Sequence, residues 1–274
     1  MKATLEFASG AVEIDLGAPV DLSTRLEFHG DQPSAFGLPR AWSEPFRAGG
    51  FVGDTRQGGS VNCETVTLNP HGNGTHTECV GHIVDERVSV SDILQDVFSR
   101  ALVISVHPEP IGTIEESYPV AHADHDVVVT LKSLRAAVGD EDLLGHALII
   151  RTLPNPESKR FAHFSGNQPV YFSHDAMRWI HSRGVKHLLV DFPSVDREED
   201  EGQLPNHHVF WDVEYGTHAL INVPSPRTIT EMIYVPEQVK DGWGVVSIHI
   251  PDFALDAAPS RPRFFRPISR EPHP

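Results

Sequence analysis

The sequence predicts an α/β fold organised as a single domain over residues 1–274. Three consecutive segments support this prediction: an apolar run at 146–152, an amphipathic segment at 173–183 and a second apolar run at 185–192. A buried strand, a helix and another buried strand in that order are typical of an α/β core. Neither an internal repeat nor a clear linker divides the chain, so one domain is expected.

The first 60 residues contain two short strand-like pieces followed by an irregular segment. Residues 11–16 alternate in polarity and predict a strand, and residues 20–23 follow a Gly-Ala-Pro turn. Residues 31–60 are rich in Gly, Pro, Arg and aromatic residues. Long irregular segments in compact domains are either functional or mobile. The aromatic side chains of this segment are expected to form a substrate wall or a subunit contact; they are Phe36, Trp42, Phe46 and Phe51. For Trp42 and Phe46 the alternative is that they cap the core.

Two strands and two helices are expected between residues 61 and 138. The strands lie at 61–68, which alternates in polarity, and at 101–106, which is continuously apolar as in a buried strand. The helices lie at 91–98, with Ser91 as N-cap, and at 130–138, with Thr130 as N-cap and Gly139 at its end.

The segment 173–183 is the clearest helix of the chain. Ser173 caps it, its apolar residues form one stripe, and Gly184 ends it. Residues 195–206 are acidic and polar and predict a loop. Residues 251–274 are rich in Pro and Arg without periodicity, and we expect them to wrap the surface or a neighbouring subunit.

Composition limits the classes of function. The formal charge is −16, from 38 acidic and 22 basic residues, which argues against nucleic acid or an anionic membrane as a partner. The two cysteines fit a reduced, cytosolic setting. The N-terminus does not resemble a signal peptide, and no apolar run reaches membrane-spanning length. A cytoplasmic location is therefore expected.

The densest group of ligand-type residues lies between Asn69 and His82. It contains His71, His76 and Glu78 in addition to His82, with three glycines among them. Imidazole nitrogens beside a carboxylate suit a divalent metal ion. His76, Glu78 and His82 share one parity, so in an extended segment their side chains leave the same face. The segment predicts a metal site, although a chain with 17 histidines also brings some together by chance.

Three ligands do not close a metal site, so others are expected from distant segments. The candidates are the adjacent His207 and His208 at the end of the acidic loop, and Glu231, a lone carboxylate among apolar residues. A buried carboxylate must be paired, protonated or metal-bound. Surface histidines and a carboxylate at a helix start are the ordinary alternatives.

These residues resemble the cyclase family, whose members include bacterial kynurenine formamidase and isatin hydrolase. The family motif His-x-Gly-Thr-His-x-Asp-x-x-x-His is matched by residues 74–82, which read Gly-Thr-His-Thr-Glu-Cys-Val-Gly-His. Residues 20–23 are similar to its N-terminal Asp-Leu-Ser, and residues 190–196 to its Asp-x-Pro-Ser-x-Asp strand end. His207 and Glu231 stand where the family has a late histidine and a late glutamate.

The resemblance implies a swivelling β/β/α fold with mixed sheets, a homodimer or homotetramer with sites near subunit contacts, and one or two divalent ions, zinc or manganese. It also implies hydrolysis of an amide C–N bond. The implied metal ligands are His76, Glu78, His207 and Glu231, and the two glutamates are able to bridge two ions. The resemblance makes His82 the proton donor and acceptor and places Phe36 near the family's substrate-stacking aromatic residue.

The chain departs from the family motif at its first histidine, where it has Gly72. His71 lies one place earlier, which in an extended strand would direct it to the opposite face. Either the glycines re-aim His71, or Asn73 substitutes for the histidine, or this ligand is absent. Glu78 also replaces the family aspartate, and Val80 replaces a proline. A missing ligand would weaken the first metal.

The expected function is metal-dependent hydrolysis of a small amide with an aromatic or cyclic body, such as N-formylkynurenine. The metal acidifies a water molecule and polarises the carbonyl, while His82 moves the proton. One alternative uses Cys79 as a nucleophile. Another is a degenerate family member that binds a small ligand without hydrolysis, which Gly72 favours.

Other polar and aromatic residues support no further prediction of function. Asp191, Ser194 and Asp196 are expected to line the pocket or to serve turns. No glycine-rich phosphate loop follows a predicted strand, so a nucleotide cofactor is not expected.

Overall fold

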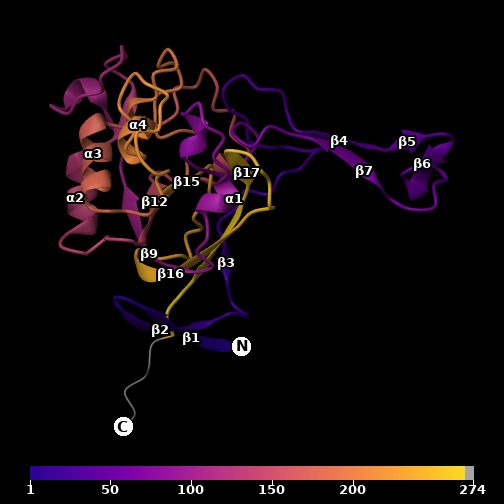
Figure 1. Ribbon diagram of the computed structural model, residues 1–274, viewed down its shortest axis with the longest axis horizontal. Coiled ribbons are helices and arrows are strands. Elements are labelled where there is room, and N and C mark those ends of the chain that lie inside the picture. Colours follow the sequence, from indigo (N-terminus) through magenta and orange to yellow (C-terminus); the bar gives the residue numbers. More distant parts are fainter. Residues whose placement is uncertain (269–274) are drawn as a thin grey trace, which may run out of the picture.

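A mixed nine-stranded sheet lies at the centre of the computed structural model, which describes residues 1–268 (Figure 1). The strand order is β17-β8-β15-β14-β12-β9-β16-β18-β3. The strands are β3 (Val20–Asp21), β8 (His76–Glu78), β9 (Ser99–Val106), β12 (Ala147–Thr152), β14 (His187–Val190), β15 (Thr228–Glu231), β16 (Gly242–His249), β17 (Ala257–Pro259) and β18 (Arg261–Phe265). The prediction of an α/β fold with a mixed sheet is confirmed.

The four central strands, β9, β12, β14 and β15, run parallel, and their outer neighbours β8 and β16 run antiparallel to them. All six residues of β12 are buried because a central parallel strand is covered on both faces. Side chains of β9 alternate between two apolar clusters. Leu102 and Ile104 belong to the cluster that includes helix residues, whereas Ala101 and Val103 belong to the cluster on the other face.

Helices α2 (Leu131–Val138) and α3 (His174–Ser182) cover one face of this sheet (Figure 1). Thr130 and Ser173 cap them, each accepting a backbone N–H of the first turn, as the sequence predicts. Two shorter helices, α1 (Val90–Ile93) and α4 (Pro205–Phe210), lie in connections. The prediction for residues 91–98 is wrong in extent and cap, because Ser89, not Ser91, accepts the first free N–H.

Residues 42–67 form an arm that projects from the body of the molecule (Figure 1). Strand β4 (Trp42–Pro45) pairs with β7 (Glu64–Thr67), and β5 (Arg47–Ala48) pairs with β6 (Phe51–Val52). The expectation of irregular structure throughout 31–60 is therefore wrong. Trp42 and Phe46 do not cap the core, because 43% and 45% of their surfaces are exposed.

The remaining elements are small. Strands β1 (Lys2–Phe7) and β2 (Gly10–Asp15) form an N-terminal hairpin, and β10 (Glu109–Pro110), β11 (Val127–Val129) and β13 (Tyr171–Phe172) form a three-stranded sheet. Short 3-10 turns lie at Thr55–Gln57, Val80–His82, Ile111–Thr113 and Glu157–Phe161.

The C-terminal segment does not simply wrap the surface. Strand β17 pairs with β8, and β18 pairs with β16 and β3, so both strands belong to the central sheet. The expectation for residues 251–274 is wrong over this part, because pairing with strands already present makes a strand of a sequence that has little periodicity of its own. Residues 269–274 lie outside the described part of the chain.

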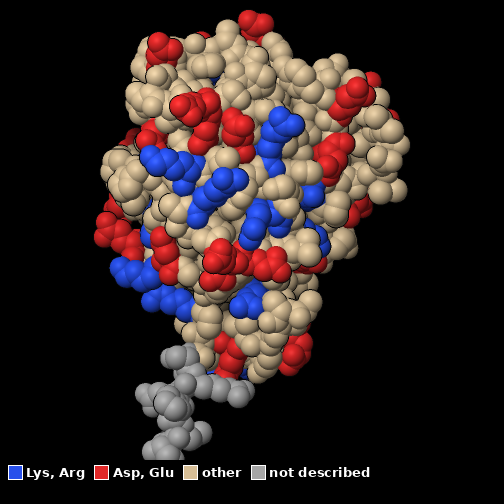
Figure 2. Space-filling view, turned by 90° about the vertical axis from the view of Figure 1, so that its left-hand side faces the viewer, with Lys and Arg blue, Asp and Glu red and all other residues tan. Residues whose placement is uncertain are grey.

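The face that carries α2 and α3 has Lys and Arg side chains interspersed with Asp and Glu (Figure 2). This face therefore presents charges of both signs side by side instead of a separate basic surface. Among the helices of residues 1–268, none is both long enough and apolar enough to cross a membrane.

Candidate metal centre

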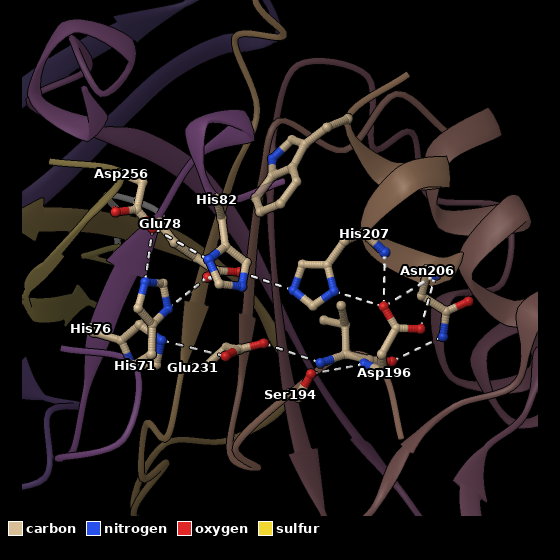
Figure 3. Close-up of polar contacts among 12 residues, drawn as sticks. His71, His76, Glu78, His82, Ser194, Asp196, Asn206, His207, Glu231 and Asp256 are labelled. Carbon is tan, nitrogen blue, oxygen red and sulfur yellow. Dashed lines mark hydrogen bonds and ion pairs between the residues drawn. The ribbon is translucent and has the colours of Figure 1, made fainter. Parts of the chain in front are cut away.

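Residues from three elements, β8, β15 and α4, converge beside the edge of the central sheet. His76 and Glu78 lie on β8, which pairs antiparallel with β15, so that His76 stands opposite Glu231. His207 comes from α4 and approaches from the other side (Figure 3). The distance from His76 Nε2 to Glu231 Oε2 is 3.4 Å, and that from His207 Nε2 to Glu78 Oε1 is 3.1 Å. These four residues, predicted as a set, lie together.

His76 presents an unpartnered nitrogen to the cluster. Its Nδ1 donates a hydrogen bond to Gly74 O at 3.0 Å, which leaves the lone pair of a neutral ring on Nε2. Nε2 is buried and has no hydrogen-bond partner. A histidine held by one nitrogen with the other left free in a carboxylate-lined site is the usual arrangement of a metal ligand. The donor set therefore fits a divalent cation.

His207 is oriented in the same way by Asp196. Its Nδ1 donates to Asp196 Oδ2 at 2.6 Å, and this carboxylate also accepts the backbone N–H groups of Asn206 and His207. Burial disfavours the charged ring, but the hydrogen bonds to Asp196 and Glu78 outweigh it and raise the pKa of His207 well above its ordinary value. Asp196 is thus the partner of a candidate ligand, a role that its position after a strand did not reveal.

His71 joins the cluster even though it is out of phase in the sequence. Residues 69–73 form a turn instead of an extended strand: Asn69 Oδ1 accepts the N–H of His71 at 3.0 Å, and Asn69 O accepts that of Gly72 at 3.2 Å. His71 Nδ1 lies 3.1 Å from Glu78 Oε2. Asn73 does not substitute for it, because its amide donates to Pro39 O and accepts from Asn69 N.

Two buried carboxylates in the cluster have opposite electrostatic environments. Burial raises the pKa of both, but the neighbouring His82, His207 and His71 lower that of Glu78 well below its ordinary value. The pKa of Glu231 stays raised, by burial and by the charge of Glu78. Glu231 is also anchored, since its Oε1 accepts the N–H of Val195 at 3.0 Å.

The side-chain atoms of residues 1–268 include three overlapping groups close enough to hold a metal ion. They are His71, His76 and Glu78; Glu78, His82 and His207; and His71, His82 and Asp256. Glu78 belongs to the first two groups, so it would be a ligand of an ion held by either group.

His82 lies at the edge of the cluster, at the end of the 3-10 turn that follows β8. Its Nε2 is 3.9 Å from Glu78 Oε2, and its Nδ1 is 3.3 Å from Asp256 Oδ2. Its side chain is 27% exposed, whereas those of His76 and Glu78 are buried. Among these residues His82 is therefore the one most open to solvent and to a ligand.

A cavity of about 260 Å³ opens onto the cluster. Its lining includes Phe36, Leu38, Ser194 and Leu204 in addition to the polar residues. Phe36 has a φ of 58° and Gly37 a φ of 62°, and Leu38 N donates to Ala35 O at 3.2 Å, which makes a tight turn that brings Phe36 to the cavity. A larger cavity of about 560 Å³ near Trp211 contains none of the cluster residues.

Cys79 does not face the cavity. It packs in an apolar cluster with Val90 and Ala258, and its Sγ lies 3.5 Å from Val88 O. Burial raises the pKa of its thiol to about 12. The alternative with Cys79 as nucleophile therefore has no geometric support.

Asp191 has a structural role. It accepts hydrogen bonds from Thr152 N, Thr152 Oγ1 and Lys159 Nζ, all within 2.9 Å, and so it links β14 to the end of β12.

The sequence did not indicate a role for Asp256. Only its contacts with His71 and His82, which join distant parts of the chain, identify it.

The family model named Cyclase matches residues 14–197, which is more than half of the chain. Three solved structures with the same fold are similar over nearly their whole length. One, described as a potential metal-dependent hydrolase with cyclase activity, is 15% identical, with 93% of this chain and 99% of that chain covered and a TM-score of 0.61.

The other two are isatin hydrolases. Isatin hydrolase A from Labrenzia aggregata bound to benzyl benzoate is 15% identical, with 92% and 94% of the two chains covered and a TM-score of 0.63. An isatin hydrolase bound to the product analogue thioisatinate is 14% identical, with 91% and 92% covered and a TM-score of 0.60.

Proposed function

Because the chain belongs to the cyclase family, we propose that it is a metal-dependent hydrolase that cleaves the C–N bond of a small amide. The observation that carries this proposal is the free, buried Nε2 of His76 in a cluster with Glu78, Glu231 and His207. An unpaired imidazole nitrogen among buried carboxylates is costly without a cation to bind it.

His71, His76, Glu78, Glu231 and His207 would hold one or two divalent ions. Mixed imidazole and carboxylate donors suit zinc and manganese. When bound, such an ion supplies Lewis acidity that makes water a better nucleophile and polarises an amide carbonyl.

His82 acts as the proton carrier of the proposed reaction. Its ring lies beside Glu78 and is open to the cavity, so it can accept a proton from the attacking water and return it to the leaving nitrogen. Glu231, fixed by the N–H of Val195, holds its free oxygen toward His76 and keeps the ligand set in place. Leu38, Leu204 and Phe36 form the apolar side of the cavity, which favours an amide with an aromatic body.

The proposed substrate is a linear N-formyl amide of an aromatic amine, as in N-formylkynurenine, or a cyclic aromatic amide such as isatin. The cavity volume of about 260 Å³ suits one or two fused rings. Binding of thioisatinate to a solved relative with the same fold supports including the cyclic class.

Elemental analysis of the purified protein, combined with turnover of N-formyl aromatic amides and of isatin, tests the proposal. We expect zinc or manganese to be bound and at least one substrate class to be hydrolysed. His82→Ala should lower kcat by a factor of about 10² to 10⁴ and leave the metal content unchanged. Loss of metal from this variant would instead make His82 a ligand.

The same assays separate hydrolysis from ligand binding without turnover. The binding alternative depends on Gly72, whereas His71 lies where it can supply the ligand that Gly72 lacks. Metal-loaded protein that binds aromatic amides but releases no product would favour the alternative.

We further propose that the arm at 42–67 joins two copies of the chain in a homo-oligomer. A two-stranded ribbon is marginally stable by itself, and this one exposes Trp42, Phe46 and Phe51. Light scattering during size-exclusion chromatography should give a dimer or tetramer for the natural protein and a smaller species for Trp42→Ser, Phe46→Ser. An unchanged mass for the variant would contradict this proposal.

A further inference from the structure

Asp256 contacts both of the histidines that line the open side of the cluster. His71 Nε2 donates to Asp256 Oδ2 at 2.8 Å, and His82 Nδ1 lies 3.3 Å from the same oxygen (Figure 3). The two rings stack with centroids 4.2 Å apart. Asp256 Oδ2 therefore contacts one nitrogen of each histidine ring, on the side of the rings away from Glu78.

The backbone holds Asp256 firmly in this position. It immediately precedes β17, whose Ala257 pairs with Glu78 of β8, and its carbonyl accepts the N–H of Cys79 at 3.0 Å. Gly81 allows this close approach, since a Cβ there would lie 2.2 Å from Val88 O and 3.3 Å from Asp256 Cβ. The carboxylate is thus carried by a strand that is hydrogen-bonded to the metal motif.

Gly72 has a packing reason of its own. A Cβ at this position would lie 2.5 Å from Leu38 Cδ1 and 3.2 Å from Ala35 O. The turn that brings Phe36 to the cavity therefore occupies the space that a side chain at 72 would need. His71 instead reaches Glu78 from one position earlier, across from Asp256.

The contacts with Asp256 also fix which nitrogens carry hydrogen. An ionised carboxylate only accepts hydrogen bonds, so His71 Nε2 and His82 Nδ1 must be the protonated nitrogens. In a neutral ring the lone pair then lies on His71 Nδ1 and His82 Nε2, the two nitrogens that face Glu78 Oε2. Once neutral, both rings therefore direct a lone pair to the cavity.

We propose that Asp256 is a positioning residue that makes His71 a metal ligand in place of the absent histidine at position 72 and sets the tautomer of His82. The part concerning His82 as a proton carrier rests on the proposed function. The part concerning His71 requires only that the protein binds a metal.

A double-mutant cycle on metal affinity tests the action of Asp256 through His71. Manganese is titrated into metal-free natural protein, Asp256→Asn, His71→Ala and the double variant, with thermal melting as a check on folding. We expect Asp256→Asn to weaken binding about 10- to 100-fold. In the His71→Ala background, Asp256→Asn should change manganese affinity by less than about twofold, because Asp256 acts on the metal through the His71 ring.

Asp252→Asn is the matched control. Asp252 lies in the same segment and is exposed, so its replacement should leave manganese affinity unchanged. Equal losses from Asp256→Asn with and without His71, or no loss at all, would overturn the role assigned to Asp256 in metal binding.

Nitrogen NMR of histidine-labelled, zinc-loaded protein at about pH 8 reads the tautomers directly. We expect His82 to carry its proton on Nδ1 in the natural protein and to lose this preference in Asp256→Asn. A proton on Nε2, or on both nitrogens, in the natural protein would overturn the assignment. A protein that binds metal but cleaves no amide would refute the proposed function. The manganese titrations and the histidine NMR would still test the role of Asp256 in that case.

Discussion

Metal binding should release protons from this protein, since His71 and His207 carry positive charge in the metal-free cluster. Burial disfavours charge on His71, but its hydrogen bonds to Asp256 and Glu78 raise its pKa to about 10. The pKa of His207 is raised as well, by Asp196 and Glu78. A metal needs the lone pair that the proton occupies, so ion and proton compete for the same nitrogen.

The size of the effect follows from the pKa of His71. At about pH 7.5 a group with a pKa of about 10 holds nearly one proton, whereas an ordinary histidine holds about 0.1. An ion bound through His71 should therefore displace about one proton. Displacement of the His71 proton alone should make the apparent affinity rise about tenfold per pH unit up to about pH 10, which corresponds to about 3 kcal/mol gained from pH 7.5.

Calorimetry in two buffers of different ionisation enthalpy measures the protons released when manganese binds. His71→Ala is the control, and its release should be smaller by about one proton per ion. If the natural protein and His71→Ala release the same number of protons per ion, His71 is neutral in the metal-free protein. The reasoning from the Asp256–His71–Glu78 contacts would then be refuted.

Three further substitutions test separate parts of the structure. Phe36→Ala should raise KM about tenfold for aromatic but not for aliphatic formamides, because the stacking surface of the cavity is lost. Equal changes in KM for the two substrate classes would contradict the stacking role. Glu231→Gln should reduce the bound metal measured by elemental analysis without lowering the melting temperature of the metal-free protein, because burial already disfavours the charge of Glu231. Lys159→Met leaves buried Asp191 without its cation and should lower the free energy of unfolding, measured in urea, by about 3 kcal/mol. The double variant Lys159→Met, Asp191→Leu should recover part of this loss. An unchanged urea midpoint for Lys159→Met would show that the ion pair does not contribute to stability.

Local patterns predicted the parts of the fold that depend on local chemistry. Helix α3 begins and ends near the residues that its Ser173 cap and Gly184 indicate, and the apolar run at 146–152 became the buried strand β12. Strands β17 and β18 were missed because their short, proline-containing sequence acquires its conformation by pairing with β8, β16 and β3.

The candidate site was predicted in part for a similar reason. His76 and Glu78 share a face because they lie on one strand, so their spacing was informative. The spacing of His71 left three alternatives open, because the direction of its side chain depends on a turn at residues 69–73 that periodicity does not predict. Asp196 and Asp256 act through contacts with residues far along the chain, and a single sequence contains no signal for such contacts.

The pairing of β17 with β8 also bears on how the protein is made. His71 and Asp256 are 185 residues apart, so the metal motif leaves the ribosome long before its last partner does. An ion that meets the nascent chain early finds His76 and Glu78 without β15, α4 or β17 around them. Metal binding is therefore expected to follow completion of the polypeptide. The ions that are available in the cell at that point then determine which metal the protein binds.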